Sequence, residues 1–219
     1  MFIYPAKAAF NRVLPKTKLY ANAKPSKSLK EKFVSQISEI VWKYKLSPDT
    51  INLAARDEFT EIQIFDILLK DPELSAEVLS VIDKAIPYPI FFRLCYEERI
   101  KGVAAFKRMA ADGSGKWLVD EYFATEWMDS TNPAMSLPVA LDLKTLYEQM
   151  LFMYIDLSPR EGEALETLVE RVKLIRKHRR ELKALEAKMN CEKQFNRKVE
   201  LNARVREIQE RLRLLTVHC

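Results

Sequence analysis

Basic and aromatic side chains alternate along the first 27 residues, a combination that is able to contact nucleic acid. The cations that we select as candidate contacts are Lys7, Arg12, Lys16, Lys18 and Lys24, and the rings between them are Phe2, Tyr4, Phe10 and Tyr20. Cations of this kind pair with phosphates, and exposed rings stack on bases. The opposing interpretation, which we favour, is that the rings anchor the segment to the rest of the protein while the lysines face water.

A second group of candidate contacts lies near the C-terminus. It consists of Lys177, Arg179, Arg180, Phe195, Arg197 and Lys198. Basic segments bind nucleic acid, and they dock equally well on an acidic protein surface. The sequence alone therefore leaves nucleic acid, a protein partner and a second copy of the chain open as ligands.

Reactive motifs are missing from the sequence. There is no GxxxxGK[ST] and no GxSxG, and only four glycines are available for a phosphate-binding loop. Ser114 has no histidine nearby in the sequence to act as its base, because His178 and His218 both lie near the C-terminus. Cys95 falls within a predicted strand, where a small buried apolar role is expected. We therefore expect no catalytic residue and no cofactor.

Carboxylates provide the remaining route to an enzyme. A divalent-metal site could draw on Glu39, Asp57, Glu58, Glu61, Asp66, Asp120, Glu121 and Glu126. The nuclease pattern of an acid followed two residues later by Lys occurs before residue 158 only at Asp142-Leu-Lys144, at a predicted helix start. Three cysteines and two histidines are too scattered for a zinc site. Solvated carboxylates without a metal are the favoured interpretation.

Charge is distributed unevenly along the chain. Residues 1–32 have eight Lys/Arg and one acid, which gives a net charge of +7. Residues 33–157 have twelve Lys/Arg and twenty acids, a net charge of −8. Residues 158–219 have sixteen Lys/Arg and ten acids, a net charge of +6. The basic C-terminal region could cover the acidic part of the protein or bind an external polyanion. No apolar run approaches the roughly 18 residues of a membrane span, and the apolar start is too short for a secretory signal. We expect a cytoplasmic protein without membrane contact.

Three regions follow from the periodicity and the turn formers. Residues 1–27 have three prolines and no periodicity, which predicts a basic, extended N-terminal segment. Residues 28–157 are predicted to form an α+β body, with a mostly antiparallel sheet and flanking helices. Residues 158–219 are predicted to form a helical arm.

Within the body, the apolar spacing and the turn signals predict the following elements. A helix begins at Ser26 or Ser28, with a capping box of Ser28 and Glu31, and continues to Tyr44. The later elements are strands 51–55 and 59–69, helix 73–85, strands 90–96, 100–108 and 116–127 in a meander, and helix 141–151. Loops are predicted at Asp112–Gly115 and between Pro133 and Pro138.

The arm has two apolar stripes with coiled-coil-like spacing, and their register is lost between Met189 and Leu201. One long helix fits this pattern, and so does a helical hairpin in which Asn196 caps the second helix. A hairpin buries the two stripes against each other, whereas a straight helix needs a partner to cover them. We slightly prefer the hairpin.

Three stretches resemble a bacterial family catalogued as domain of unknown function 4391. They are Tyr4-Pro5 to Phe10-Asn11 with Leu14-Pro-Lys16; Ile86-Pro-Tyr-Pro-Ile90 with Lys116-Trp117 and Glu121–Trp127; and Glu192–Asn202. Gln194-Phe195-Asn196 is the most specific part, because heptad spacing does not require it, and Ala6 stands where a lysine is expected. The resemblance implies a setting beside helicases and DNA methylases in restriction or phage-defence clusters, and it implies no activity.

Our leading hypothesis is a non-enzymatic accessory subunit of a bacterial DNA-processing or phage-defence complex. Its arm would contact a helicase- or methylase-like partner or a second copy. One alternative is a protein that binds nucleic acid directly through the N-terminal segment and the arm. The other is a metal-dependent enzyme on the acidic body.

Overall fold

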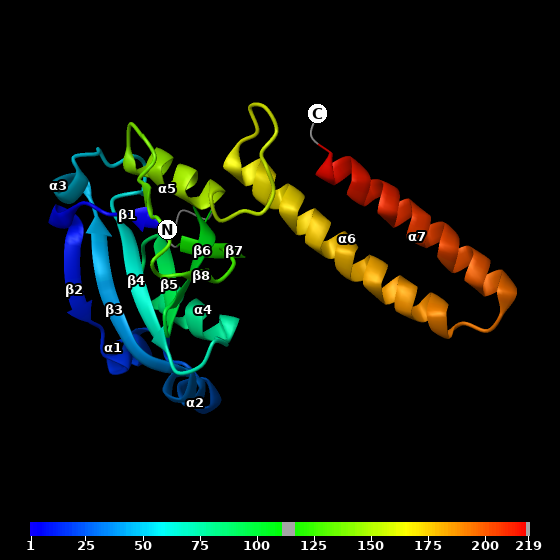
Figure 1. The fold of residues 1–219 in the computed structure, drawn as a ribbon, viewed down its shortest axis with the longest axis horizontal. Coiled ribbons are helices and arrows are strands. Elements are labelled where there is room, and N and C mark those ends of the chain that lie inside the picture. The colour runs from blue at the N-terminus through cyan, green and yellow to red at the C-terminus, as the bar shows by residue number, and fades with distance from the viewer. Residues whose placement is uncertain (111–116, 218–219) are drawn as a thin grey trace. The chain divides into compact units, whose positions relative to one another are not determined.

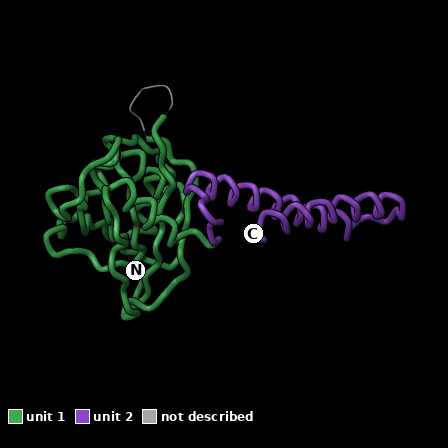
Figure 2. Tube along the Cα trace, turned by 90° about the horizontal axis from the view of Figure 1, so that it is seen from above, with its two compact units in different colours: residues 1–156 green, residues 157–219 purple. Residues whose placement is uncertain are grey.

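The computed structural model describes residues 1–110 and 117–217, and its internal contacts divide the chain into two compact units (Figures 1 and 2). We call residues 1–156 the body and residues 157–219 the arm. The predicted loop Asp112–Gly115, with Ser114, lies outside the described residues, and so do His218 and Cys219. In the described part of the chain, no helix is both long and apolar enough to cross a membrane.

The body is built on one mixed sheet in which strands follow each other in chain order (Figure 1). The strands are β2 (Ala9–Val13), β3 (Ile37–Leu46), β4 (Ile62–Leu69), β5 (Ile90–Tyr96), β6 (Arg99–Met109) and β7 (Trp117–Ala124), and β8 (Met128–Asp129) also pairs with β6. Strands β4 and β5 run parallel and the other neighbours in this sheet are antiparallel. A separate parallel pair joins β1 (Phe2–Ile3) to β9 (Met135–Ser136). The predicted α+β fold with a mostly antiparallel sheet is confirmed.

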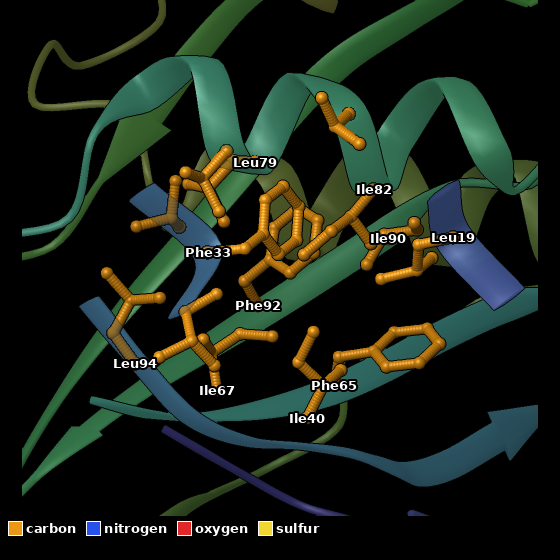
Figure 3. Packing of buried hydrophobic residues seen from close by; sticks show 14 of the residues in the cluster. Leu19, Phe33, Ile40, Phe65, Ile67, Leu79, Ile82, Ile90, Phe92 and Leu94 are labelled. Atoms are coloured by element: carbon orange, nitrogen blue, oxygen red, sulfur yellow. The ribbon is translucent and has the colours of Figure 1, made fainter. Parts of the chain in front are cut away.

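Helices cover both faces of the sheet. Helices α1 (Lys16–Ala23), α2 (Lys27–Gln36) and α4 (Ala76–Ala85) bury their apolar side chains against one face, where Phe33, Leu79 and Ile82 meet Phe65 and Phe92 (Figure 3). Because side chains alternate along a strand, Phe91 points to the other face. There it contacts Tyr147 of α5 (Leu143–Phe152), with ring centroids 6.0 Å apart. The helix α4 also supplies the crossover that a parallel β4–β5 pair requires.

The prediction of an extended N-terminal segment is wrong over α1. Residues 16–23 are helical, and a 3₁₀ turn, η1 (Ala6–Ala8), precedes β2. Pro15 lies at the N-cap of α1 and Pro25 lies beyond its C-cap at Lys24. Proline is tolerated just before the first helical turn and just after the last, so these prolines bracket the helix and do not forbid it.

The predicted helix from Ser28 to Tyr44 is half right. Helix α2 begins after Ser26, whose hydroxyl accepts a hydrogen bond from the Leu29 backbone N–H at 3.3 Å, and it ends at Gln36. The rest of the prediction falls on β3. The pairing of β3 shifts register between Ile37 and Glu39, so Ile37 and Ile40 reach the same apolar cluster although they are three residues apart. The irregular pairing therefore produces helix-like spacing in a strand.

Two further elements of the body differ from expectation. The predicted strand 51–55 is wrong: Ile51 ends α3 (Pro48–Ile51), a single helical turn that Ser47 and Thr50 cap reciprocally, and residues 52–55 pair only through an isolated bridge from Ala54 to Asp142. The helix predicted from residue 73 begins at Ala76, because the carboxylate of Asp71 accepts from the Glu73 backbone N–H in a turn. The strands predicted at 59–69, 90–96, 100–108 and 116–127, and the helix at 141–151, correspond to β4, β5, β6, β7 and α5.

The arm is a hairpin of two long helices, α6 (Leu165–Cys191) and α7 (Phe195–Thr216), which run side by side (Figure 1). The hairpin prediction is confirmed and the single long helix is excluded. Apolar residues that recur at helical spacing are buried in both helices: Leu168, Val172 and Ile175 in α6, and Leu201, Val205 and Ile208 in α7. Asn196 is not the cap as predicted, because α7 starts one residue before it and Gln194 is the N-cap.

Candidate nucleic-acid interface

The aromatic residues of the N-terminal segment serve as anchors in the body. Phe2 and Tyr4 are buried. The ring of Tyr4 lies 4.6 Å from that of Tyr44, Phe10 lies 4.1 Å from Trp42, and Tyr20 meets Phe33 edge-on at 5.4 Å, all measured between centroids. These rings are committed to protein contacts and are not presented as a surface on which bases could stack.

The five N-terminal candidate cations do not behave as one group. Lys16 is half-buried in α1 and its Nζ donates to the Ile37 carbonyl at 2.7 Å; burial lowers the pKa of this amine. Arg12, on β2, lies over the Phe10 ring at 4.4 Å. Lys7, Lys18 and Lys24 are exposed, in η1, in α1 and at the end of α1. Lys16 is therefore a structural residue, and the others are separated along the segment.

The net positive charge of the arm comes from the half that contains the bend. We call residues 176–206 the distal half and residues 158–175 with 207–217 the proximal half. The distal half has eleven Lys/Arg and four acids, a net charge of +7, whereas the proximal half has five and six, −1. All six C-terminal candidates lie in the distal half: Lys177, Arg179 and Arg180 on α6, and Phe195, Arg197 and Lys198 in the first turn of α7.

The two halves of the arm also differ in how their cations are paired. In the proximal half, Arg171 pairs with Glu163, Lys173 with Glu170, Arg211 with Glu207, and Arg213 with Glu210. In the distal half, ten exposed cations form no ion pair with any carboxylate of the described residues. They are Lys177, Arg179, Arg180, Lys183, Lys188, Lys193, Arg197, Lys198, Arg204 and Arg206. The distal half therefore offers cations that need not leave a carboxylate in order to bind an anion.

The bend brings several of these cations together beside an exposed ring. A small pocket of about 210 Å³ between the end of α6 and the start of α7 is lined by Lys188, Glu192, Arg197, Glu200, Leu201 and Arg204. The Glu192 carboxylate accepts from the backbone N–H groups of Lys193 and Gln194, both at 2.8 Å, and these bonds lower its pKa. Phe195, at the start of α7, is 77% exposed. Cations and an aromatic ring thus share the tip of the hairpin.

The other end of the hairpin is closed by buried arginine contacts. Arg171 is 5% exposed, and its guanidinium donates to both carboxylate oxygens of Glu163 at 2.8 and 2.6 Å. It also donates to the carbonyls of Ser158 at 2.9 Å and Leu215 at 3.0 Å. The bonds from Arg171 to the carboxylate lower the pKa of Glu163. Arg171 therefore ties the segment before α6 to the last turn of α7 and sets the register of the two helices.

The most deeply buried charges of the body form a closed network. Lys107 on β6 and Asp83 on α4 have fully buried side chains, with Nζ 2.7 Å from Oδ1. Lys107 Nζ also donates to the Tyr88 carbonyl at 2.7 Å, and the Tyr122 hydroxyl donates to Asp83. Burial raises the pKa of Asp83 and lowers that of Lys107, and their mutual attraction opposes both shifts.

This network does not open onto a reactive surface. A shallow pocket of about 510 Å³ between α2 and α4 has Tyr122 in its lining, together with Ser26, Ser80 and Lys84. The Tyr122 hydroxyl donates its hydrogen bond to Asp83, and the side chain of Lys107 is fully buried. The groups satisfy each other, which is the arrangement that a buried polar cluster needs for stability.

Several of the carboxylates considered for a metal site pair with cations of the body. Asp66 accepts two hydrogen bonds from Arg93, each 2.6 Å long, Glu61 pairs with Lys45, and Asp57 pairs with Lys144. Among the described residues, no three acids, cysteines or histidines lie close enough together to hold a metal ion. Asp142 caps α5 through the Thr145 backbone N–H. Burial raises the pKa of the Cys95 thiol to about 11, so little of the reactive thiolate is present at neutral pH.

The chain resembles a known protein family over nearly its whole length. The profile of a family described as Domain of unknown function (DUF4391) matches residues 2–212. The chain belongs to the DUF4391 family. The match includes the body and nearly all of the arm, so the family profile covers the hairpin as well as the sheet. Comparison with curated proteins and with solved structures finds no match.

Some features of the interface were not predicted from the sequence. Lys183, Lys188, Lys193, Arg204 and Arg206 were not selected as candidates, although they share the distal half with the predicted cations. A charge count over each half of a folded hairpin would have found them, but it requires the position of the bend. The buried Lys107–Asp83 pair gave only a weak signal in the sequence, because each charged residue directly follows an apolar run, and the role of Lys16, between Pro15 and Thr17, gave none.

Proposed function

We propose that the protein is a non-enzymatic accessory subunit of a bacterial DNA-processing or phage-defence complex in the cytoplasm, and that the distal half of its arm contacts nucleic acid. The setting is the one that the family resemblance implies. The observation that carries the nucleic-acid contact is the concentration, between residues 177 and 206, of ten exposed cations that pair with no carboxylate of the described residues.

The physical argument rests on counterion release. Nucleic acid carries condensed cations, and each protein cation that neutralises a phosphate frees some of them into solution. A cation that already pairs with a carboxylate gains less, because it must give up that partner. Ten cations of the distal half have no such partner among the described residues, whereas Lys173, Arg211 and Arg213 of the proximal half do. The distal half is therefore the favoured surface for phosphates.

Charge removal at matched positions tests this contact. We expect Lys177→Gln/Arg179→Gln/Arg180→Gln to weaken binding to a labelled DNA strand in an anisotropy titration. If these three cations contact phosphates, the slope of log affinity against log salt decreases in magnitude by about 2 to 3. The control Lys173→Gln/Arg211→Gln/Arg213→Gln removes the same charge from the proximal half and leaves the slope unchanged.

The outcomes separate a local contact from a general charge effect. Equal losses in the two triple variants contradict a distal interface and indicate that only net charge matters. A wild-type protein that shifts no DNA or RNA at low salt rejects the nucleic-acid contact altogether. An acidic surface of a protein partner would then be the ligand of the distal cations.

Membership of a complex is tested independently. The full chain, purified from its native host at physiological salt, is expected to retain a helicase- or methylase-like protein. Recovery of the free monomer alone would overturn the accessory role and would leave the nucleic-acid contact to stand by itself.

A further inference from the structure

The ring of Phe195 is not used by the hairpin that carries it. Leu201, Val205 and Ile208 of α7 are buried against α6, whereas Phe195 is 77% exposed. Residues 195, 199, 202 and 206 recur at spacings of four and three, which places them on one side of the helix. All four are exposed, and Val199 is 52% exposed. An aromatic ring therefore begins an open stripe that continues with Val199, Asn202 and Arg206.

The surroundings of this ring restrict what can cover it. Lys193, Arg197 and Lys198 lie within three residues of Phe195 in the sequence; they are exposed and form no ion pair within the described residues. An apolar protein groove would bury these cations without compensation, which is costly. A nucleotide offers both things that the tip lacks, a planar base for the ring and a phosphate for the cations.

The base must be accessible for such a contact to form. In a duplex the faces of the bases are stacked on their neighbours, and only unpaired or extruded bases present a face to a protein ring. We propose that Phe195 stacks on an unpaired base, so that the tip of the hairpin selects single-stranded nucleic acid over duplex. This inference rests on the proposed nucleic-acid contact and specifies its substrate class.

Substitutions at this exposed position test stacking in the full-length protein. Affinities are measured for a short labelled strand and for the corresponding blunt duplex. Phe195→Ala is expected to weaken binding to the single strand about tenfold, which corresponds to the loss of one base–ring stack, and to change binding to the duplex by less than about twofold. Phe195→Trp keeps a ring and retains the affinity for the single strand, whereas Phe195→Leu keeps only apolar bulk and loses it. Val199→Ala, one turn along the same stripe, is the matched control and leaves both affinities unchanged.

A direct signal of stacking complements the affinities. A strand that contains 2-aminopurine is expected to lose fluorescence on binding the wild type and Phe195→Trp, and to keep it with Phe195→Leu. Single-strand affinity that is unaffected by Phe195→Ala, or an equal loss on strand and duplex, overturns the stacking role. In that case a salt-dependent wild-type affinity still supports the proposed function. Absence of binding by the wild type to either substrate rejects the proposed function itself.

Discussion

At the scale of single residues, the stability of the body depends on the buried ion pair between Lys107 and Asp83. Both side chains are fully buried, and each depends on the other for compensation. A buried ion pair contributes little net stability compared with apolar residues of the same shape, but removal of one partner leaves an uncompensated charge. The pair therefore constrains substitutions more strongly than it stabilises the fold.

The first prediction follows from this asymmetry. Lys107→Met is expected to lower the free energy of unfolding of the body by about 3 to 5 kcal/mol, because Asp83 loses its cation. The double variant Lys107→Met/Asp83→Leu is expected to lose less than the single variant. Urea titrations followed by tryptophan fluorescence measure both. A double variant less stable than Lys107→Met would show that the Tyr88 and Tyr122 contacts dominate.

At the scale of the elements, the proximal end of the hairpin depends on the pair formed by Arg171 and Glu163. Hydrogen bonds from Arg171 hold the pKa of Glu163 below its ordinary value of 4.5. A carboxyl whose pKa is lowered by folding contributes stability above its unfolded pKa, and that contribution is lost as the pH falls through the folded pKa. The hairpin should therefore be stable at neutral pH and lose this contribution only in acid.

The second prediction uses the variant Glu163→Gln, which has no carboxyl to titrate. The difference in unfolding free energy between wild type and Glu163→Gln is expected to be largest at neutral pH. It should shrink below about pH 4.5, where the carboxyl of the unfolded chain becomes protonated, and vanish below the lower pKa of the folded state, where the carboxyl of the folded hairpin is neutral as well. Helical circular dichroism in denaturant measures this difference. As a control, Glu210→Gln removes an exposed carboxyl from the Arg213 pair and should change stability little. A difference for Glu163→Gln that persists unchanged in acid would contradict an electrostatic origin.

The elements also show where prediction from sequence works and where it fails. Strands β4 to β7 and the two helices of the arm were predicted because their apolar residues follow regular periods of two or of three and four. Strand β3 was mistaken for helix because its irregular pairing displaces Ile40 by one position. Helix α1 was missed because it is short and bracketed by prolines whose exact places at a helix end cannot be known from composition.

Only part of the distal interface could be predicted from the sequence, and the reason differs from that for β3 and α1. Its cations are recognisable in the sequence, but their pairing is a property of the folded hairpin. Lys173 and Lys177 are one turn apart on α6, and among the described residues Lys173 pairs with the carboxylate of Glu170 whereas Lys177 pairs with none. Exposure of Phe195 likewise depends on where α7 begins.

At the scale of the whole molecule, the chain forms two compact units, and the third prediction is that they unfold independently. All three tryptophans, Trp42, Trp117 and Trp127, belong to the body, so their fluorescence reports on that unit alone. Leu168→Ala, at a fully buried position of α6, is expected to destabilise the arm by about 2 to 5 kcal/mol. It should lower the denaturant midpoint of the unfolding transition seen by helical circular dichroism and leave the midpoint seen by tryptophan fluorescence unchanged.

The reciprocal variant completes the experiment. Phe92→Ala removes a fully buried ring from the body and is expected to shift the tryptophan transition by a similar or larger free energy. Coincident shifts of both signals in either variant would show that the two units unfold as one cooperative block.

The edge of the sheet at β2 has a consequence for the molecule at high concentration. An edge strand with free backbone groups is a template on which another chain can add a strand, and proteins avoid this with irregular, charged edges. The register of β2 against β3 shifts between Ala9 and Arg12, and Asn11 between them adopts a left-handed conformation with φ of 48°. The kink and the adjacent guanidinium interrupt the ladder that an incoming strand would need. This edge thus guards the protein against sheet-to-sheet aggregation.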